Sequence, residues 1–310
     1  MDAEPRSLEV RIADEIPAGT RLDSYLADTL NLFTRSQARK RVVSLSLNGR
    51  PAKLSRRLAP GDLLRVEYRD APTIDLLPEP IPLTVIYEDR NVVVVDKPVG
   101  MVVHPAAGNH SGTLVNALLH YCAQLAGEFP GEEVRPGVVH RLDKGTSGVI
   151  ITAKNLASRE FLARQFRQRR VGKQYIAIVQ GEPPAEAGRI ESRLVRDRRH
   201  RKRFRSLAGG TQGKSAVTLY RVLRRKAGHC LLSLRPRTGR THQLRVHLAS
   251  LGCPIVGDSL YGSRVREALM LHAYRLRLRL PGCPTASTFH SALPGRFAAY
   301  WRGLGGCSAR

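Results

Sequence analysis

Short stretches in which apolar and polar residues alternate recur along the chain from about residue 84 onward. QYIAIVQG (174–181), AVTLYRVL (216–223) and CLLSLRP (230–236) repeat with a period of two, which is typical of strands with one buried face. VVVVDKPVGMVVH (92–104) predicts two strands around a turn, and GVIITAK (148–154) predicts a short buried strand. Helical spacing is found at 158–170 and 242–252. Because crossover helices do not separate the strands regularly, we predict an α+β domain with a mainly antiparallel, mixed sheet.

The first 70 residues predict a second, smaller α+β domain. Leu22, Tyr25, Leu26 and Leu30 share one face of a helix, and Thr34 can cap another helix that is rich in basic residues. Turn signals at 48–49 and 60–62 and the stretch LLRVEY (63–68) predict strands after these helices. Residues 71–83 hold four prolines, so we expect an extended, semi-rigid linker. The predicted organisation is therefore a small domain at 17–70, a linker at 71–83 and a large domain at 84–305.

Charge adds a strong indication of the partner. The chain holds 51 Lys and Arg against 26 Asp and Glu, a net charge of +25. Residues 198–310 alone carry 23 basic and two acidic residues, and residues 35–69 carry ten basic and two acidic residues. Such an excess favours a polyanion partner, and nucleic acid is the obvious one, because each phosphate contact releases counterions. The tract RDRRHRKRFRS (196–206) is biased enough to predict a mobile basic loop.

Several other classes of protein are disfavoured by the sequence. No run of 18 apolar residues predicts a membrane span, and the N-terminus shows no signal-peptide pattern. The five cysteines are scattered without a C-x-x-C pair, so we expect reduced thiols, a cytoplasmic location and no metal site. GGTQGKS (209–215) resembles a phosphate loop, but Ala208 stands where a glycine is needed. We therefore expect a monomer that uses no cofactor.

The stretch HRLDKGTSGVI (140–150) carries the most distinctive chemistry. It places Asp143 among His140, Arg141 and Lys144, directly before an apolar run. Neighbouring cations favour the ionised form of a carboxyl group. From these residues alone, two interpretations stay open: a salt bridge within a loop, or a charged group of an active site.

A second stretch, RPRTGRTHQLRVH (235–247), is found far along the chain. Together with HRLDKGTSG, DKPVGMVVHP, GKQYIAIVQG, GCPIVGDSLYG and LHAYRL, in this order, it resembles the RluA/RluD family of RNA pseudouridine synthases over about residues 84–300. VVHPAAGNHSGTLVNALLHY (102–121) resembles the RluD branch more than the RluC branch. The N-terminal domain resembles the S4 RNA-binding module, except that VVSLSLNG stands where that family usually shows a glycine before the strand.

The resemblance implies an enzyme that isomerises uridine to pseudouridine in RNA after the base has been flipped out, and the expected substrate is 23S ribosomal RNA or a large-subunit particle. Two alternatives stay open: an enzyme that acts on tRNA or mRNA, and an rRNA-binding assembly factor without catalysis. By the resemblance, Asp143 acts on the sugar, either as a nucleophile at C1′ or as a base at C2′. Tyr175 stacks on the uracil, Arg245 pairs with Asp143, Leu271 lines the base pocket, and Arg141 fills the space that the base has left. Looser expectations of RNA contact or of support to the site concern Lys97, Lys144, Arg237, Arg240 and His242 in the large domain, and Arg39, Lys40 and Arg41 in the small one.

Overall fold

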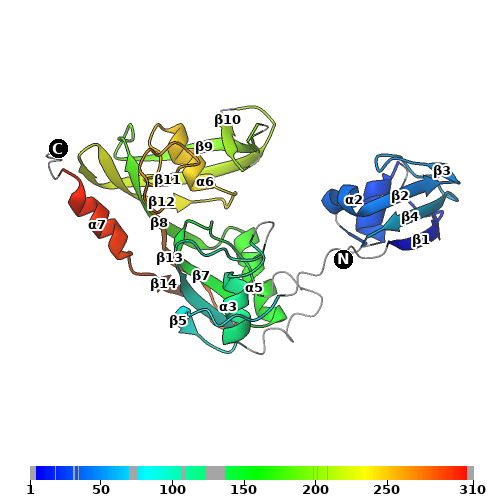
Figure 1. Cartoon of the computed structure of the whole chain (residues 1–310). Helices are drawn as coiled ribbons and strands as arrows, with labels where there is room; N and C mark the ends of the chain where they lie inside the picture. The colour runs from blue at the N-terminus through cyan, green and yellow to red at the C-terminus, as the bar shows by residue number, and fades with distance from the viewer. Residues whose placement is uncertain are drawn as a thin grey trace. The chain divides into compact units, whose positions relative to one another are not determined.

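The chain divides into two compact units, Met1–Thr73 and Ile74–Arg310, in a computed structural model (Figure 1). The division falls inside the proline-rich segment at 71–83. The structure describes residues 5–17, 19–30, 32–33, 35–69, 76–105, 109–122, 137–197, 199–200, 202–207 and 209–305, without the side chains of Ser36 and Lys40. Thr34, Cys307 and residues 71–75 therefore lie outside the described part.

The N-terminal unit is a four-stranded sheet with helical segments. Its elements are β1 (Arg6–Arg11), α1 (Leu22–Ser24), the π-helical turn η1 (Tyr25–Thr29), α2 (Arg35–Arg41), β2 (Val42–Leu47), β3 (Arg50–Pro51) and β4 (Leu63–Tyr68). The strand order is β1-β4-β2-β3. Leu22 and Leu26 are fully buried in its core, as their helical spacing predicts. The unit begins earlier than the predicted residue 17, because β1 pairs along its whole length with β4.

The larger unit is built on one ten-stranded sheet. Its strands are β5 (Thr84–Glu88), β6 (Val92–Lys97), β7 (Ser147–Ala153), β8 (Gly172–Gln180), β9 (Ala187–Arg196), β10 (Phe204–Leu207), β11 (Lys214–Lys226), β12 (His229–Pro236), β13 (Leu271–Arg279) and β14 (Ala286–His290). They run in the order β10-β9-β11-β12-β8-β13-β7-β6-β5, and β14 pairs with β13. Only β13 and β7 are paired in parallel among the described strands. The prediction of an α+β fold with a mainly antiparallel sheet is confirmed.

Among the described residues of this unit, four helices cover parts of the sheet: α3 (Leu114–Tyr121), α5 (Leu156–Arg167), α6 (Gln243–Ser250) and α7 (Gly295–Gly303). Helices α3 and α5 lie beside the β5–β7 half, and α6 lies beside β9, β10 and β11 (Figure 1). The buried apolar side chains form one large cluster in each half of the sheet, and a smaller cluster surrounds Leu194 and Val246. Tyr175 on β8 packs against both clusters, so the centre of the sheet is where the two halves meet.

The second strand predicted within VVVVDKPVGMVVH does not form. After β6, the chain makes a loop in which Val102 forms only an isolated bridge to Thr113. The side chain of Lys97 is fully buried, and its ammonium donates to the carbonyl oxygens of Pro98 and Met101, both at 2.8 Å. Because a buried cation needs hydrogen-bond acceptors, these carbonyls turn inward instead of joining a sheet. Lys97 is therefore not available to contact RNA, and of the two roles expected for it only support to the site stays a prediction.

Two other segments differ from the sequence-based expectations. Residues Phe204–Leu207, at the end of the tract predicted as a mobile loop, form β10 and pair with β9. Residues 76–83 are attached to the larger unit and do not form a free linker. The side-chain amide of Asn116 donates to the carbonyl oxygen of Leu77 at 2.9 Å, and the Glu79 backbone amide donates to the carbonyl oxygen of Asn116 at 3.0 Å. The larger unit therefore begins before residue 84.

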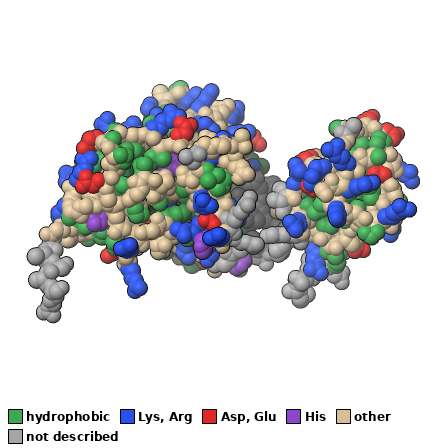
Figure 2. All heavy atoms as spheres, turned by 90° about the horizontal axis from the view of Figure 1, so that it is seen from above, with side chains coloured by type: hydrophobic (Ala, Val, Ile, Leu, Met, Phe, Trp, Pro, Cys, Tyr) green, Lys and Arg blue, Asp and Glu red, His purple; other side chains and the backbone are tan. Residues whose placement is uncertain are grey.

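Basic side chains outnumber acidic ones on the surface of the larger unit. Figure 2 shows more Lys and Arg than Asp and Glu side chains on its visible face. This distribution agrees with the net charge of +25. A surface of this kind attracts polyanions from a distance.

Candidate active site

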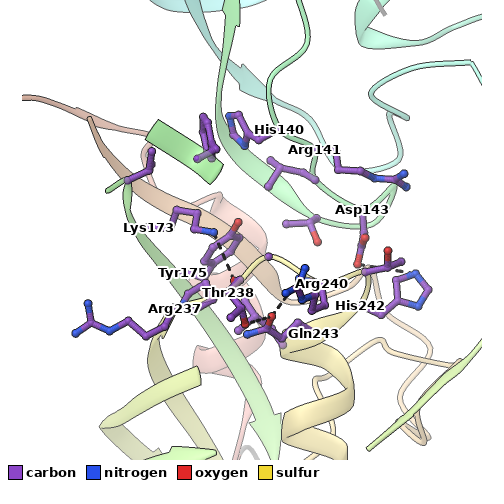
Figure 3. A pocket seen from close by; sticks show the side chains of 18 of the residues that line it. His140, Arg141, Asp143, Lys173, Tyr175, Arg237, Thr238, Arg240, His242 and Gln243 are labelled. Atoms are coloured by element: carbon purple, nitrogen blue, oxygen red, sulfur yellow. Dashed lines mark hydrogen bonds and ion pairs between the residues drawn. The ribbon is translucent and has the colours of Figure 1, made fainter. Parts of the chain in front are cut away.

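A cavity of about 460 Å³ opens at the centre of the larger sheet. Its walls come from β8, β13, the loop before β7, and the loop between β12 and α6 (Figure 3). The cavity brings together seven of the predicted site residues: Arg141, Asp143, Tyr175, Arg240, His242, Arg245 and Leu271. Its size is that of a small-ligand pocket.

The loop that carries Asp143 is fixed by the strand that follows it. Gly148 has a φ of +117°, and a Cβ there would lie 2.3 Å from the carbonyl oxygen of Ala273. Only glycine therefore permits the close parallel approach of β7 and β13 at this point. His140 Nε2 accepts from the Ile151 backbone amide at 3.1 Å, and its ring stacks on Phe166. Burial lowers the pKa of His140 to about 3, so this histidine is a neutral structural group.

Asp143 faces the guanidinium of Arg245. Arg245 Nη1 lies 3.5 Å from Asp143 Oδ2. Arg245 has a closer partner in Asp258, because its Nε and Nη2 donate to the two oxygens of that carboxylate at 2.7 and 2.8 Å. Burial acts to lower the pKa of Arg245, but the hydrogen bond and charge of Asp258 outweigh it and raise that pKa. Asp258 was not among the predicted site residues, although it is one of only two acidic residues in the basic region 198–310.

His242 and Tyr261 complete the surroundings of the carboxylate. His242 Nε2 lies 4.0 Å from Asp143 Oδ2, and its Nδ1 is hydrogen-bonded to the Tyr261 hydroxyl at 2.8 Å. The guanidinium carbon of Arg245 lies 5.0 Å from the centre of the Tyr261 ring. Burial lowers the pKa of His242, although the charge of Asp143 acts in the opposite direction. His242 has a φ of 56°, a strained value that is found at functional sites.

Gln243 fixes the loop between β12 and α6. Its side-chain oxygen accepts from the Thr238 hydroxyl at 2.6 Å and from the Arg240 backbone amide at 3.1 Å. Its amide nitrogen donates to the Thr218 hydroxyl on β11 at 3.0 Å. Arg240 is half-buried and donates from Nε to the carbonyl oxygen of Ser215. The TGRTHQ loop is therefore held against the sheet, which sets the start of α6 and the position of Arg245.

The other side of the cavity suits a planar base. Tyr175 projects from β8, and the side chain of Leu271, which is 3% exposed, comes from the adjacent strand β13. Burial raises the pKa of Tyr175, and the charge of Asp143 adds to this shift, so its hydroxyl stays protonated at neutral pH. Lys173, which the sequence analysis missed, lies beside them and donates to the carbonyl oxygen of Thr238 at 3.5 Å. Burial lowers the pKa of Lys173.

The remaining predicted residues lie at the rim or elsewhere. Arg141, Lys144 and Arg237 are exposed, and the Lys144 ammonium donates to Asn109 Oδ1 at 3.1 Å. In the view of Figure 3, Arg141 lies above Asp143 and Tyr175 lies to its left. Arg237 is at the edge of the cavity.

Three basic residues predicted to contact RNA belong to α2 of the separate N-terminal unit. Arg39 is exposed there, whereas the side chain of Lys40 lies outside the described part. Arg41 is half-buried and donates to the carbonyl oxygen of Arg69 at 2.9 Å, and its guanidinium lies over the Phe33 ring. Arg41 is therefore engaged in the unit's own structure to a greater extent than Arg39.

Within the described residues, no cluster of three or more His, Cys, Asp and Glu side chains is placed to bind a metal ion. The helices among those residues are also too short or too polar to span a bilayer. Cys122, Cys230, Cys253 and Cys283 are free thiols.

Comparison with known proteins agrees with the chemistry of the cavity. The profile of the RNA pseudouridylate synthase family matches residues 91–250. The chain is 43% identical over 290 residues to Ribosomal large subunit pseudouridine synthase D of Borreliella burgdorferi, which covers 90% of this chain and 88% of that protein. It is 37% identical to the protein of the same name in Neisseria meningitidis serogroup A, over 94% of this chain and 81% of that one.

A solved structure shares the fold as well. Human RNA Pseudouridylate Synthase Domain Containing 4 superimposes with a TM-score of 0.57 at 28% identity, covering 71% of this chain and 92% of the human one. The family profile spans the loop of Asp143, the strand of Tyr175 and the helix of Arg245. The chain therefore belongs to the RNA pseudouridylate synthase family and is an RNA pseudouridine synthase.

Proposed function

We propose that this enzyme forms pseudouridine in large-subunit ribosomal RNA and that Asp143 is its catalytic carboxylate. The choice of RNA is supported by the name that the relatives from Borreliella burgdorferi and Neisseria meningitidis carry, Ribosomal large subunit pseudouridine synthase D. The assignment of Asp143 is carried by one observation: it is the only carboxylate among the described residues that line the central cavity.

The cavity accommodates a uridine that has left its stack. The uracil lies between Tyr175 and Leu271, which gives a planar base one aromatic and one apolar surface. The ribose then lies toward Asp143, at the edge that Arg141 shares. Arg141 is exposed and long enough to occupy the space in the RNA from which the base was taken.

The reaction exchanges one bond for another. The bond between C1′ and N1 breaks, the base turns within the cavity, a bond forms between C5 and C1′, and the proton on C5 is replaced by one on N1. No electrons are gained or lost overall. Asp143 starts the reaction either by attacking C1′ or by removing the C2′ proton, and both routes require an ionised oxygen beside the sugar.

Arg245 supports this carboxylate from a fixed position. Two of its nitrogens are held by Asp258, so the third nitrogen faces Asp143 at 3.5 Å. A guanidinium that is already held in place stabilises negative charge without reorganising during the reaction. Tyr175, which remains protonated, can donate its hydroxyl proton to a hydrogen bond while the C5 proton leaves.

Mapping of pseudouridine by carbodiimide labelling tests the proposal. Ribosomal RNA from cells that lack the enzyme should show loss of label at specific uridines of the large-subunit RNA. Wild-type protein should restore them, and Asp143→Asn should not. If both proteins restore the same positions, the role of Asp143 is wrong. If the restored positions lie in tRNA or mRNA, the proposed substrate is wrong but the role of Asp143 stands.

The N-terminal unit is proposed to be an S4-like RNA-binding domain. Residues 35–69 carry ten basic and two acidic residues, and Arg39 on α2 is exposed. A helix with exposed arginines suits contacts to RNA phosphates. In filter binding, Arg39→Glu should weaken the affinity for ribosomal RNA fragments, whereas Glu9→Gln on β1 should not.

A further inference from the structure

A second cavity of about 550 Å³ meets the first at the catalytic carboxylate. Asp143, Arg141, His242 and Arg245 line both cavities. The other walls of the second cavity come from the loop after β6, from the turn at 257–259 and from residues 268–269. Since Tyr175 and Leu271 line only the first cavity, the two spaces extend from Asp143 in different directions.

The walls of the second cavity combine apolar and cationic groups. Val99 is 37% exposed although it is a large apolar residue, and Leu269, which is buried, also lines the cavity. The ammonium of Lys144 and the guanidinium of Arg141 are both exposed at the same cavity. Asn109 holds the Lys144 ammonium from the described part of the loop before α3. The exposed apolar side chain of Val99 and the two cations suit a group that has a planar part and carries a phosphate.

We propose that the second cavity binds the nucleotide adjacent to the target uridine. Its base lies against Val99 and Leu269, and its phosphate faces Lys144. This inference rests on the proposed function, because it takes the target ribose to lie at Asp143.

Chain continuity supports this occupant. A uridine whose ribose reaches Asp143 remains bonded through its phosphates to a neighbour on each side. The space that continues from Asp143 is the second cavity, whose volume suits a nucleotide. A single-stranded neighbour exposes its base face, and proteins recognise RNA loops by contact with such unstacked bases. The subsite would therefore contribute to the choice of uridine, since its affinity depends on which neighbour can leave the stack.

The test combines a change in the protein with a change in the RNA. Val99→Trp fills the cavity from its rim, and Leu293→Trp places the same residue at an exposed apolar position that lines neither cavity. The substrates are a ribosomal RNA stem-loop containing a uridine identified by mapping, and versions of it with one abasic nucleotide on either side of that uridine. Tritium release from 5-tritiated uridine measures kcat/KM for each pair.

We expect an abasic nucleotide at one neighbouring position to lower kcat/KM of the wild-type enzyme by about tenfold, because the burial of one base face against apolar side chains is lost. Val99→Trp should lower kcat/KM on the intact RNA by a similar factor. On the RNA that is abasic at that position, the kcat/KM of Val99→Trp should fall by less than about twofold further, since the same contact cannot be removed twice. Leu293→Trp should behave like wild type.

The inference is overturned if the abasic and Val99→Trp effects multiply at both neighbouring positions, or if neither change has an effect. In both of these cases the wild-type enzyme is still active on the intact stem-loop, so the proposed function stands. Lys144→Gln should raise KM and leave kcat within about twofold, whereas Lys214→Gln, at an exposed position outside both cavities, should leave both unchanged. A fall in kcat alone would exclude the phosphate contact.

Discussion

Replacing Asp258 by asparagine should lower both the stability and the activity of this enzyme, whereas replacing Asp143 should abolish activity alone. The two carboxylates share Arg245, but they do so unequally. The side chain of Asp258 is 1% exposed and holds the guanidinium at 2.7 and 2.8 Å, whereas that of Asp143 is 19% exposed and lies at 3.5 Å.

The expected magnitudes follow from this difference. Asp258→Asn leaves a guanidinium, 12% exposed, without its buried counter-charge, a change that destabilises proteins by about 3–5 kcal/mol. Asp143→Asn removes a longer and more exposed pair while Arg245 keeps Asp258, so the loss should stay within about 1 kcal/mol. The order of the two variants is reversed for the loss of activity. Activity should fall by about 10⁴-fold or more for Asp143→Asn, and by about 10- to 100-fold for Asp258→Asn through misplacement of Arg245.

Urea unfolding followed by tryptophan fluorescence measures the stability of the larger unit, which contains this site. Trp301 is the only tryptophan, and it packs in α7 against the core of the larger unit. With a slope of about 3 kcal/mol per M, the midpoint of Asp258→Asn should shift downward by about 1 M or more. Glu267→Gln, at the other acidic residue of the region 198–310, is exposed and serves as the control. Equal midpoints for Asp258→Asn and Glu267→Gln, or equal destabilisation by Asp143→Asn and Asp258→Asn, would refute the unequal sharing of Arg245.

Four other outcomes can be measured. Burial raises the pKa of Tyr175, so this tyrosine should not ionise below pH 10. Absorbance at 295 nm, which reports tyrosine ionisation, should therefore rise equally up to pH 10 in wild type and in Tyr175→Phe, and a smaller rise in the variant would contradict this. Burial lowers the pKa of His247 from 6.5 to about 4, so the unfolded chain binds more protons between these values; stability should fall as pH drops through this range, and less steeply in His247→Gln. Gly148→Ala should destabilise the larger unit by several kcal/mol, because its Cβ would meet the carbonyl oxygen of Ala273; an unchanged urea midpoint would exclude this. Affinity for RNA should fall steeply with salt concentration, and a flat plot of log K against log salt would contradict the role given to the +25 charge.

Elements with a regular period could be predicted from the sequence. Strands β8, β11 and β12 and helix α6 lie where alternation or helical spacing places them. Strand β1 was missed although RSLEVRI alternates, because it needs β4, more than 50 residues away, as its partner. The strand expected after Lys97 fails for a reason that the pattern does not contain. Whether a lysine is buried depends on the rest of the fold, and only a buried lysine takes the loop carbonyls for itself.

The candidate site shows the same limit. Asp143, Tyr175, Arg245 and Leu271 could be chosen by resemblance, and the structure places all four at one cavity. Asp258 carries no local sign of its role, since its partner Arg245 is on α6 and the contact exists only once the following turn has folded back. An acidic residue in a region of 23 basic residues was the available signal. A rare acidic residue in a strongly basic region can therefore indicate a structural carboxylate where the local sequence pattern does not.

The unequal sharing of Arg245 also explains how its guanidinium can stabilise the Asp143 carboxylate without engaging both carboxylate oxygens. A guanidinium facing a lone carboxylate forms two parallel hydrogen bonds, which engage both oxygens. Here that geometry belongs to Asp258, and one remaining nitrogen stays 3.5 Å from Asp143. Asp143 thus receives the positive field while its oxygens stay accessible from both cavities. Either proposed role at the sugar needs such a free oxygen, so the buried Asp258 makes Arg245 compatible with catalysis.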